Sequence, residues 1–225
     1  MDLKAISCNS TGFNFEKANF IKILMNAMNV DILFLQEHMH LRANLYKIQS
    51  HMGDLESFFI PAVISNKVVF AGRPSGGLAI FWRKKLNNCV KMIKHPDSIR
   101  VQAIELLGKV IMVNTYFPTD DQYNNVNEFE LLKCISEIKW YFERFPHHRF
   151  VIAGDLNTDF SRNTRFVNIV RDFFLNYNLV SVWSAFNVDF TFCSHQVRNG
   201  NNIMSTSCID HFILQSPNLD IVSHS

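Results

Sequence analysis

Short apolar runs that stop abruptly on polar side chains recur along this chain and constrain its fold more than any other feature. Residues 150–153 read as a strand covered on both faces, and Gly154 after them permits a sharp change of direction. Asp155 and Asn157 follow at once. If the chain stays extended, their side chains project from the same face, because the side-chain period of a strand is two. We expect a proton acceptor beside an amide donor here, although an Asx-rich turn explains the four residues equally well.

Strand-type and helix-type patterns alternate in the first half of the chain. Residues 3–7 and 30–37 have the apolar character of strands, and apolar residues recur at helical spacing between them, which predicts a β-α-β unit. Residues 76–82, 99–107 and 110–118 are three further strand candidates with no helix between them. Their arrangement suggests antiparallel pairing.

Two more amphipathic helices and a strand-rich end follow. Residues 179–183, 189–194 and 208–214 are short strand candidates, and residues 195–207 between the last two read as a polar loop. The apolar faces expected for the three helices are Phe20, Ile23, Leu24, Ala27 and Met28; Phe129, Leu132, Ile135, Ile138 and Phe142; and Phe166, Ile169, Val170, Phe173 and Tyr177.

Length and pattern together predict one α/β domain. The chain has 225 residues, of which 48% are hydrophobic, so it can bury a substantial core. Residues 1–225 show no repeat, low-complexity tract or interdomain linker. Mixed strands with helices at intervals predict sheets packed together with helices outside.

Charge and cysteine usage narrow the class of protein. A net charge of +2 excludes a purely electrostatic nucleic-acid binder, although a local basic patch is compatible with it. The five cysteines are odd in number and include no C-x-x-C pair, which argues against a disulfide framework and a structural zinc site. The start of the chain lacks the layout of a signal peptide, and no apolar run has the length of a membrane span. We expect an intracellular protein, nuclear or cytoplasmic, that is not secreted or bound to membranes.

Polar side chains recur where the apolar runs stop. They include Gln36 and Glu37, Asn114 and Tyr116, and Asp210. Taken singly, Glu37 suits a solvated strand end, Tyr116 a core aromatic with a surface hydroxyl, and Asp210 a turn. Their repetition favours a functional cleft, because such strand ends are where layered α/β folds form sites.

An ordered series of motifs resembles a known family. The motifs are Asn9 in SCNSTG, Glu37 in LFLQEH, the segment SGGLAIF, Tyr116 in VNTYFP, GDLN, Thr191 in DFTF and Asp210 in IDHF. In this order they resemble the endonuclease/exonuclease/phosphatase family, and most of all the apurinic-type endonuclease domain of LINE-type (non-LTR) retrotransposons. The resemblance covers residues 3–214. It implies a four-layer sandwich, two mixed sheets face to face with helices on both outer sides, and magnesium-dependent phosphodiester hydrolysis.

The resemblance also implies a role for each motif residue. Glu37 would ligate Mg²⁺ (or Mn²⁺) with Asn9 beside it, as suits a hard cation that keeps several waters. Tyr116 would hydrogen-bond the scissile phosphate. Asp155 would orient or deprotonate the attacking water, Asn157 would donate to a phosphate oxygen, and Asp210 would complete the acidic wall.

This mixture of side chains has a chemical reason. In-line attack on phosphorus accumulates negative charge on the non-bridging and leaving oxygens, so catalysis needs fixed donors and a cation more than a covalent nucleophile. A lone carboxylate would repel the substrate. Asp155 is therefore useful only with the metal, Asn157 and Tyr116 around it.

The final motif of the family is missing. The resemblance implies a Ser-Asp-His motif on a last strand, whose histidine stabilises the phosphate in the transition state. His224 lacks the preceding aspartate and lies at a chain end, and His211 should point away from Asp210 in an extended strand. We expect a truncation before that strand, an exposed sheet edge, and a rate lowered by about 10² to 10³.

Several cations and amides are candidate DNA contacts. Arg73 and the charge run 83–85 flank residues 76–82, although a solvated charge run explains the latter as well. Arg198 and Asn199 lie before Asp210 and, with Thr191, are candidate substrate contacts. The resemblance makes residues 194–207 a candidate for target preference.

Three functions remain open. The first is a monomeric endonuclease that nicks DNA and leaves a 3′-hydroxyl, which a reverse transcriptase domain in a longer parent chain would extend. The second keeps the fold but acts on a small or lipid phosphoester. The third is an inactive fragment. His38 and His40 beside Glu37 invite a zinc site, but no third ligand follows at a usual spacing.

Overall fold

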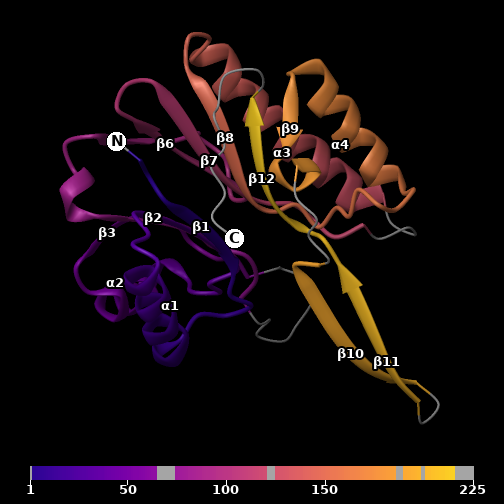
Figure 1. Ribbon diagram of the computed structural model, residues 1–225, viewed down its shortest axis with the longest axis horizontal. Helices are drawn as coiled ribbons and strands as arrows, with labels where there is room; N and C mark the ends of the chain where they lie inside the picture. Colours follow the sequence, from indigo (N-terminus) through magenta and orange to yellow (C-terminus); the bar gives the residue numbers. More distant parts are fainter. Residues whose placement is uncertain (1, 65–73, 121–124, 186–189, 199–200, 216–225) are drawn as a thin grey trace.

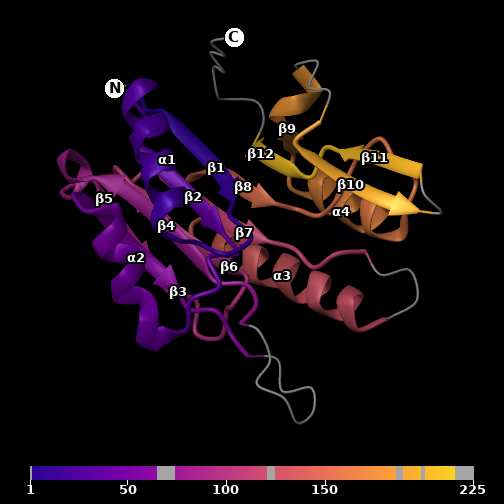
Figure 2. The same cartoon turned by 90° about the horizontal axis from the view of Figure 1, so that it is seen from below.

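The chain folds into two β-sheets that face each other, with helices on both outer sides (Figures 1 and 2). The computed structural model describes residues 2–64, 74–120, 125–185, 190–198 and 201–215. The expected α/β four-layer sandwich is therefore confirmed. No helix in these ranges is long and apolar enough to span a bilayer.

The first sheet has four strands in the order β1-β2-β4-β3. β1 and β2 are parallel and are joined through the first helix, as the β-α-β pattern predicted. β4 then pairs antiparallel with both β2 and β3. The elements of this half are β1 (Ala5–Asn9), α1 (Phe15–Ala27), β2 (Ile32–Gln36), α2 (Leu45–Met52), β3 (Leu55–Ile60) and β4 (Leu78–Arg83).

The second sheet has six strands in the order β5-β6-β7-β8-β12-β9. β7 and β8 are parallel because α3 crosses between them, and the other neighbours are antiparallel. The elements are β5 (Val90–Ile93), β6 (Val101–Leu106), β7 (Val110–Tyr116), α3 (Asn125–Arg144), β8 (Arg149–Asp155), α4 (Arg165–Asn176), β9 (Leu179–Ser181) and β12 (Asp210–Gln215).

Two expectations about the strands were wrong. The candidate at residues 76–82 does not pair with the two that follow it, because β5 intervenes and β4 belongs to the other sheet. The expected polar loop at residues 195–207 contains most of a hairpin, β10 (Phe192–Arg198) and β11 (Asn201–Ser207), which projects from the body of the molecule (Figure 1). The sequence did not predict these strands, because a hairpin outside the core needs no apolar face and so lacks the alternating apolar pattern of a strand.

The helices cover the outer faces of the sheets, but α1 buries a different stripe from the one expected. Ala18, Ile21 and Met25 face the core, whereas Phe20 and Ile23 are each 68% exposed. Apolar residues occupy two sides of this helix, and the small Ala18 lets its own side approach the sheet closely. In α3, Phe129 and Leu132 are likewise exposed; Ile135, Ile138 and Phe142 are buried as expected. The expected face of α4 packs against the core.

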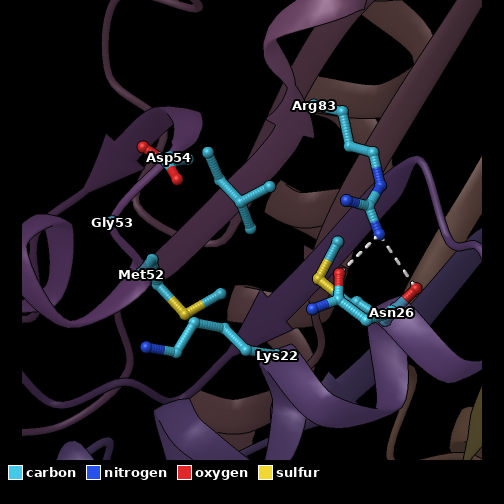
Figure 3. A pocket seen from close by; sticks show the side chains of 8 residues that line it. Lys22, Asn26, Met52, Gly53, Asp54 and Arg83 are labelled. Atoms are coloured by element: carbon cyan, nitrogen blue, oxygen red, sulfur yellow. Dashed lines mark hydrogen bonds between the residues drawn. The ribbon is translucent and has the colours of Figure 1, made fainter.

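The charge run 83–85 stabilises the fold at the C-terminal end of β4. The other end of this strand pairs with Gln36. Arg83 donates through Nε to the Val30 carbonyl at 2.7 Å. Through Nη2 it donates to the Met25 carbonyl and the Asn26 amide oxygen, both at 3.0 Å (Figure 3). It thereby satisfies carbonyls at the C-terminal end of α1. Lys84 and Lys85 pair with Asp54 and Asp31 at 3.6 and 2.6 Å. These contacts give the run a structural role, whereas its role as a DNA contact stays a prediction. Arg73 lies outside the described residues.

Buried amides connect the two sheets. Asn114 Nδ2 donates to the carbonyls of Leu35 and Ala79 at 3.2 and 3.0 Å, and its Oδ1 accepts from Gln36 Nε2 at 2.7 Å. Gln102, also buried, continues this polar layer toward β3. Gln36 and Asn114, which we grouped with the polar strand ends, are thus structural residues of the interior.

Candidate functional site

The polar residues at the strand ends lie together at one end of the sandwich. Asn9 and Glu37 come from the ends of β1 and β2, Tyr116 and Asp155 from the ends of β7 and β8, and Asp210 begins β12. Asp155 pairs with Asp210 on one side and Tyr116 on the other. The structure therefore brings together five residues that the sequence suggested.

Asn9 bridges the two sheets at this end. Its Nδ2 donates to Glu37 Oε2 at 3.0 Å and to Asp155 Oδ2 at 2.8 Å. Its Oδ1 accepts from the Thr11 backbone N–H at 2.9 Å, which fixes the orientation of the amide. The amide thereby keeps two carboxylates close together that would otherwise repel each other.

Asp155 is buried and firmly held. Oδ2 accepts from Asn9, and Oδ1 accepts from the Asn157 backbone N–H at 2.8 Å. Burial raises the pKa of Asp155 to about 7, and the nearby charge of Asp210 adds to the rise. A carboxylate held in this way can accept a proton or orient a water molecule.

Asn157 reaches the site through a turn, not through an extended strand. β8 ends at Asp155, and Asn157 has a left-handed backbone with φ of 46°. Its N–H bond to the Asp155 side chain closes an Asx turn. The Asx-turn interpretation of this segment is therefore confirmed, and the strand-period argument for a shared face is wrong. The functional pairing of Asp155 with the Asn157 amide stays a prediction. Asn157 Nδ2 donates to the Phe117 carbonyl at 2.7 Å, and its second amide hydrogen is a further donor.

Tyr116 lies close to two acidic residues of the cluster, Glu37 and Asp155. Its hydroxyl is hydrogen-bonded to Glu37, and burial followed by the Glu37 charge raises the pKa of Tyr116. Glu37 has φ of 53°, a costly conformation for a residue with a side chain. Arg100 lies over the Tyr116 ring, 5.2 Å from its centroid. We did not predict Arg100 as a site residue; its position near the start of the strand candidate 99–107 was the available signal.

Asp210 is held by groups outside the acidic cluster. Its backbone N–H donates to Thr191 Oγ1 at 3.0 Å, and its carbonyl accepts from Trp183 Nε1 at 2.6 Å. Burial raises the pKa of Asp210, and a hydrogen bond from Thr191 opposes the rise. Its Oδ1 is buried without a hydrogen-bond partner among the described residues. Thr191 thus supports Asp210, and its contact with substrate stays a prediction.

The remaining expected residues lie away from this cluster or outside the described parts. Arg198 has its backbone at the tip of β10, where it pairs with Asn201, and its side chain is not described. Asn199 and His224 lie outside the described residues. His211 is buried, and its Nε2 lies 3.0 Å from the Thr158 carbonyl, so it packs behind the site as strand alternation predicted.

The oxygen atoms of the site suit a hard divalent cation. Glu37 and Asp210 supply carboxylates, and Asn9 supplies an amide oxygen, which accepts from Thr11 in this structure. The buried Oδ1 of Asp210 has no hydrogen-bond partner within the described parts of the chain. No three His, Cys, Asp or Glu side chains of the described ranges form a metal site by themselves. Magnesium commonly takes only one or two carboxylates and completes its shell with water and phosphate oxygens.

Comparison with known proteins places the chain in a family. The model of the endonuclease/exonuclease/phosphatase family matches residues 7–201. The chain belongs to this family. No curated protein matches it in sequence.

Solved structures of low sequence identity share the fold. An AP endonuclease from Leishmania major has a TM-score of 0.72 at 17% identity, over 95% of this chain and 79% of that one. A 3′ phosphatase from Neisseria, solved with a product DNA hairpin, has a TM-score of 0.68 at 16% identity, over 95% and 87%. The catalytic domain of human Nocturnin, solved with a sulfate anion, has a TM-score of 0.57 at 15% identity, over 95% and 81%.

Proposed function

We propose that this family member is a divalent-metal-dependent phosphodiesterase that nicks DNA, as the endonuclease of a LINE-type retrotransposon. One observation carries the proposal: Asn9, Glu37 and Asp155 meet at the end where the two sheets come together, with Asn157, Tyr116 and Asp210 around them. Carboxylates, neutral donors and a phenol in one place are what phosphodiester hydrolysis requires.

Each residue takes a part that its contacts allow. Asp155, held on both oxygens, orients the attacking water. Asn157 uses its second amide hydrogen for a phosphate oxygen, and Tyr116 gives up its bond to Glu37 to donate to the phosphate. Asp210 keeps the far wall acidic, and Arg100 over the Tyr116 ring adds a positive charge for the substrate.

Glu37 and Asn9 would hold the metal, which we propose to be Mg²⁺, with Mn²⁺ as a substitute. When bound, the cation neutralises charge on the phosphate. The ligand pair would be the Glu37 carboxylate and the Asn9 amide oxygen, which would give up a bond from Thr11 to bind the cation.

The DNA substrate and the retrotransposon origin rest on the motif resemblance. The projecting hairpin β10–β11 begins beside Thr191 and ends before Asp210, so it extends outward from the site (Figure 1). We propose that it contacts DNA through Arg198 at the end of β10 and through Asn199, which lies outside the described residues. The partner is then a reverse transcriptase domain in a longer parent chain, and the location is intracellular.

Nicking of supercoiled plasmid in magnesium tests the proposal, with this chain and with the longer parent chain. We compare Asp155→Asn with Asp172→Asn, the same change at an exposed position of α4. We expect nicking that EDTA abolishes, a loss of about 10² or more in Asp155→Asn, and no loss in Asp172→Asn. A folded parent chain that binds magnesium and leaves DNA intact would contradict the DNA substrate and favour a small phosphoester.

A further inference from the structure

A hollow lies between the edges of the two sheets, away from the cluster of acidic residues. The edge strands β3 and β5 form its sides, and Tyr141 of α3 lies in its wall. Its volume is about 400 Å³, within the range of small-molecule sites. None of the candidate catalytic or metal-binding residues lines it.

The lining has one sign of charge. Arg42, Lys94 and His95 contribute basic groups, and no aspartate or glutamate lines the hollow. The carboxylate of Glu137 is nearby, but it is buried and accepts a 2.6 Å bond from Ser98. A hollow that is basic at its rim and free of lining carboxylates favours an anion.

The rest of the lining is largely apolar. Phe58, Ile60 and Ile93 contribute apolar side chains, and Met92 lines the hollow while 50% exposed. The Tyr141 hydroxyl in the wall is buried; it interacts with the His95 backbone, but among the described residues it makes no bond of full hydrogen-bond geometry. Buried polar groups are normally paired, so a ligand that reaches this hydroxyl would satisfy it.

We infer that this hollow binds a small organic anion with an aromatic or aliphatic body. The body packs between Phe58, Ile60 and Met92, while the anionic group lies at Arg42 and Lys94. An inorganic anion alone leaves the apolar lining in contact with water, and a neutral ligand leaves the cations unpaired. A nucleoside monophosphate and a medium-chain carboxylic acid both have this chemistry.

The probe for the test is 8-anilinonaphthalene-1-sulfonate, which joins an aromatic body to one negative charge. Its fluorescence is titrated with the whole chain and with the Arg42→Gln/Lys94→Gln double variant. The matched control is Lys47→Gln/Lys91→Gln, which removes two exposed lysines from α2 and β5 that do not line the hollow. The neutral N-phenyl-1-naphthylamine reports what the apolar lining contributes alone.

We expect saturable binding of the sulfonate that weakens about tenfold or more in the Arg42/Lys94 variant and stays unchanged in the control. The neutral probe should change less than about threefold, since its binding uses no charge. Displacement of the sulfonate by adenosine monophosphate identifies a nucleotide ligand, and displacement by decanoate identifies a carboxylic acid. Equal binding by both double variants, or displacement by neither competitor, would overturn the inference.

Discussion

Asn9 and Asp155 lie 146 residues apart in the chain, yet Asn9 Nδ2 donates to Asp155 Oδ2 at 2.8 Å. The residues belong to different sheets, so the contact joins the halves of the sandwich at the candidate site. The same nitrogen also donates to Glu37 at 3.0 Å. One neutral amide therefore orders two carboxylates.

Replacing Asn9 by alanine should disable the site with little effect on the fold. The change removes both bonds and leaves the carboxylates of Glu37 and Asp155 to repel each other. We expect nicking activity to fall by about 10² while the melting temperature changes by only a few degrees. Asn88→Ala, at an exposed position, is the control. An Asn9→Ala chain with full activity would remove this residue from the site.

Magnesium should stabilise the folded chain through Glu37. A cation that binds only the native state raises stability by about 1.4 kcal/mol at ten times its dissociation constant, or about 4 °C for a chain of this size. We expect this rise in thermal unfolding, its reversal by EDTA, and its absence in Glu37→Gln. Glu143→Gln, exposed on α3, should keep the full rise. An equal rise in both variants would place the cation elsewhere.

Much of the fold could be predicted because apolar strand runs and helical spacing report burial directly. The strand ending at Gln36 and the strand ending at Asp155 are continuous apolar runs, and both are central strands. The pairing of β4 could not be predicted, since periodicity carries no information about which sheet a strand joins. The hydrophobic stripe of α1 was misplaced because two stripes of that helix carry apolar side chains.

The order of the motifs suggested which residues form the candidate site. It did not suggest the contacts between them. Polar strand ends at Glu37, Asp155 and Asp210 converge as expected. The same signal also selected Gln36 and Asn114, which instead join the sheets in the interior. A polar residue near a strand end is ambiguous, because its side chain can face the site or the opposite sheet.

Gly154 should tolerate no side chain, because a Cβ atom added there would meet the backbone of β7. A Cβ atom there would stand 1.9 Å from the Thr115 carbonyl oxygen, and φ is +144°. Since backbone cannot yield as a side chain can, we expect Gly154→Ala to lose about 4 kcal/mol or more, or not to fold. Gly53→Ala is the control: φ is +65° and the added Cβ meets nothing within 4 Å, so it should cost about 1 kcal/mol. Urea unfolding measures both, and equal losses would contradict the steric argument.

His38 should make the fold sensitive to acid. Its ring is fully buried, Nδ1 accepts from the His40 backbone N–H at 3.0 Å, and Nε2 lies 3.1 Å from the Ile60 carbonyl. Only the neutral ring suits both contacts, and burial lowers the pKa of His38 from 6.5 to about 4. The unfolded chain therefore binds the proton first, so this contribution is complete above pH 6.5 and is lost as the pH falls toward 4.

We expect the free energy of unfolding to drop by about 2 kcal/mol from pH 7.5 to pH 5 on account of His38. Urea unfolding at both pH values measures it, and His38→Gln should flatten the dependence by that amount while His147→Gln, exposed before β8, leaves it unchanged. An unaltered slope in His38→Gln would assign the acid sensitivity to other groups.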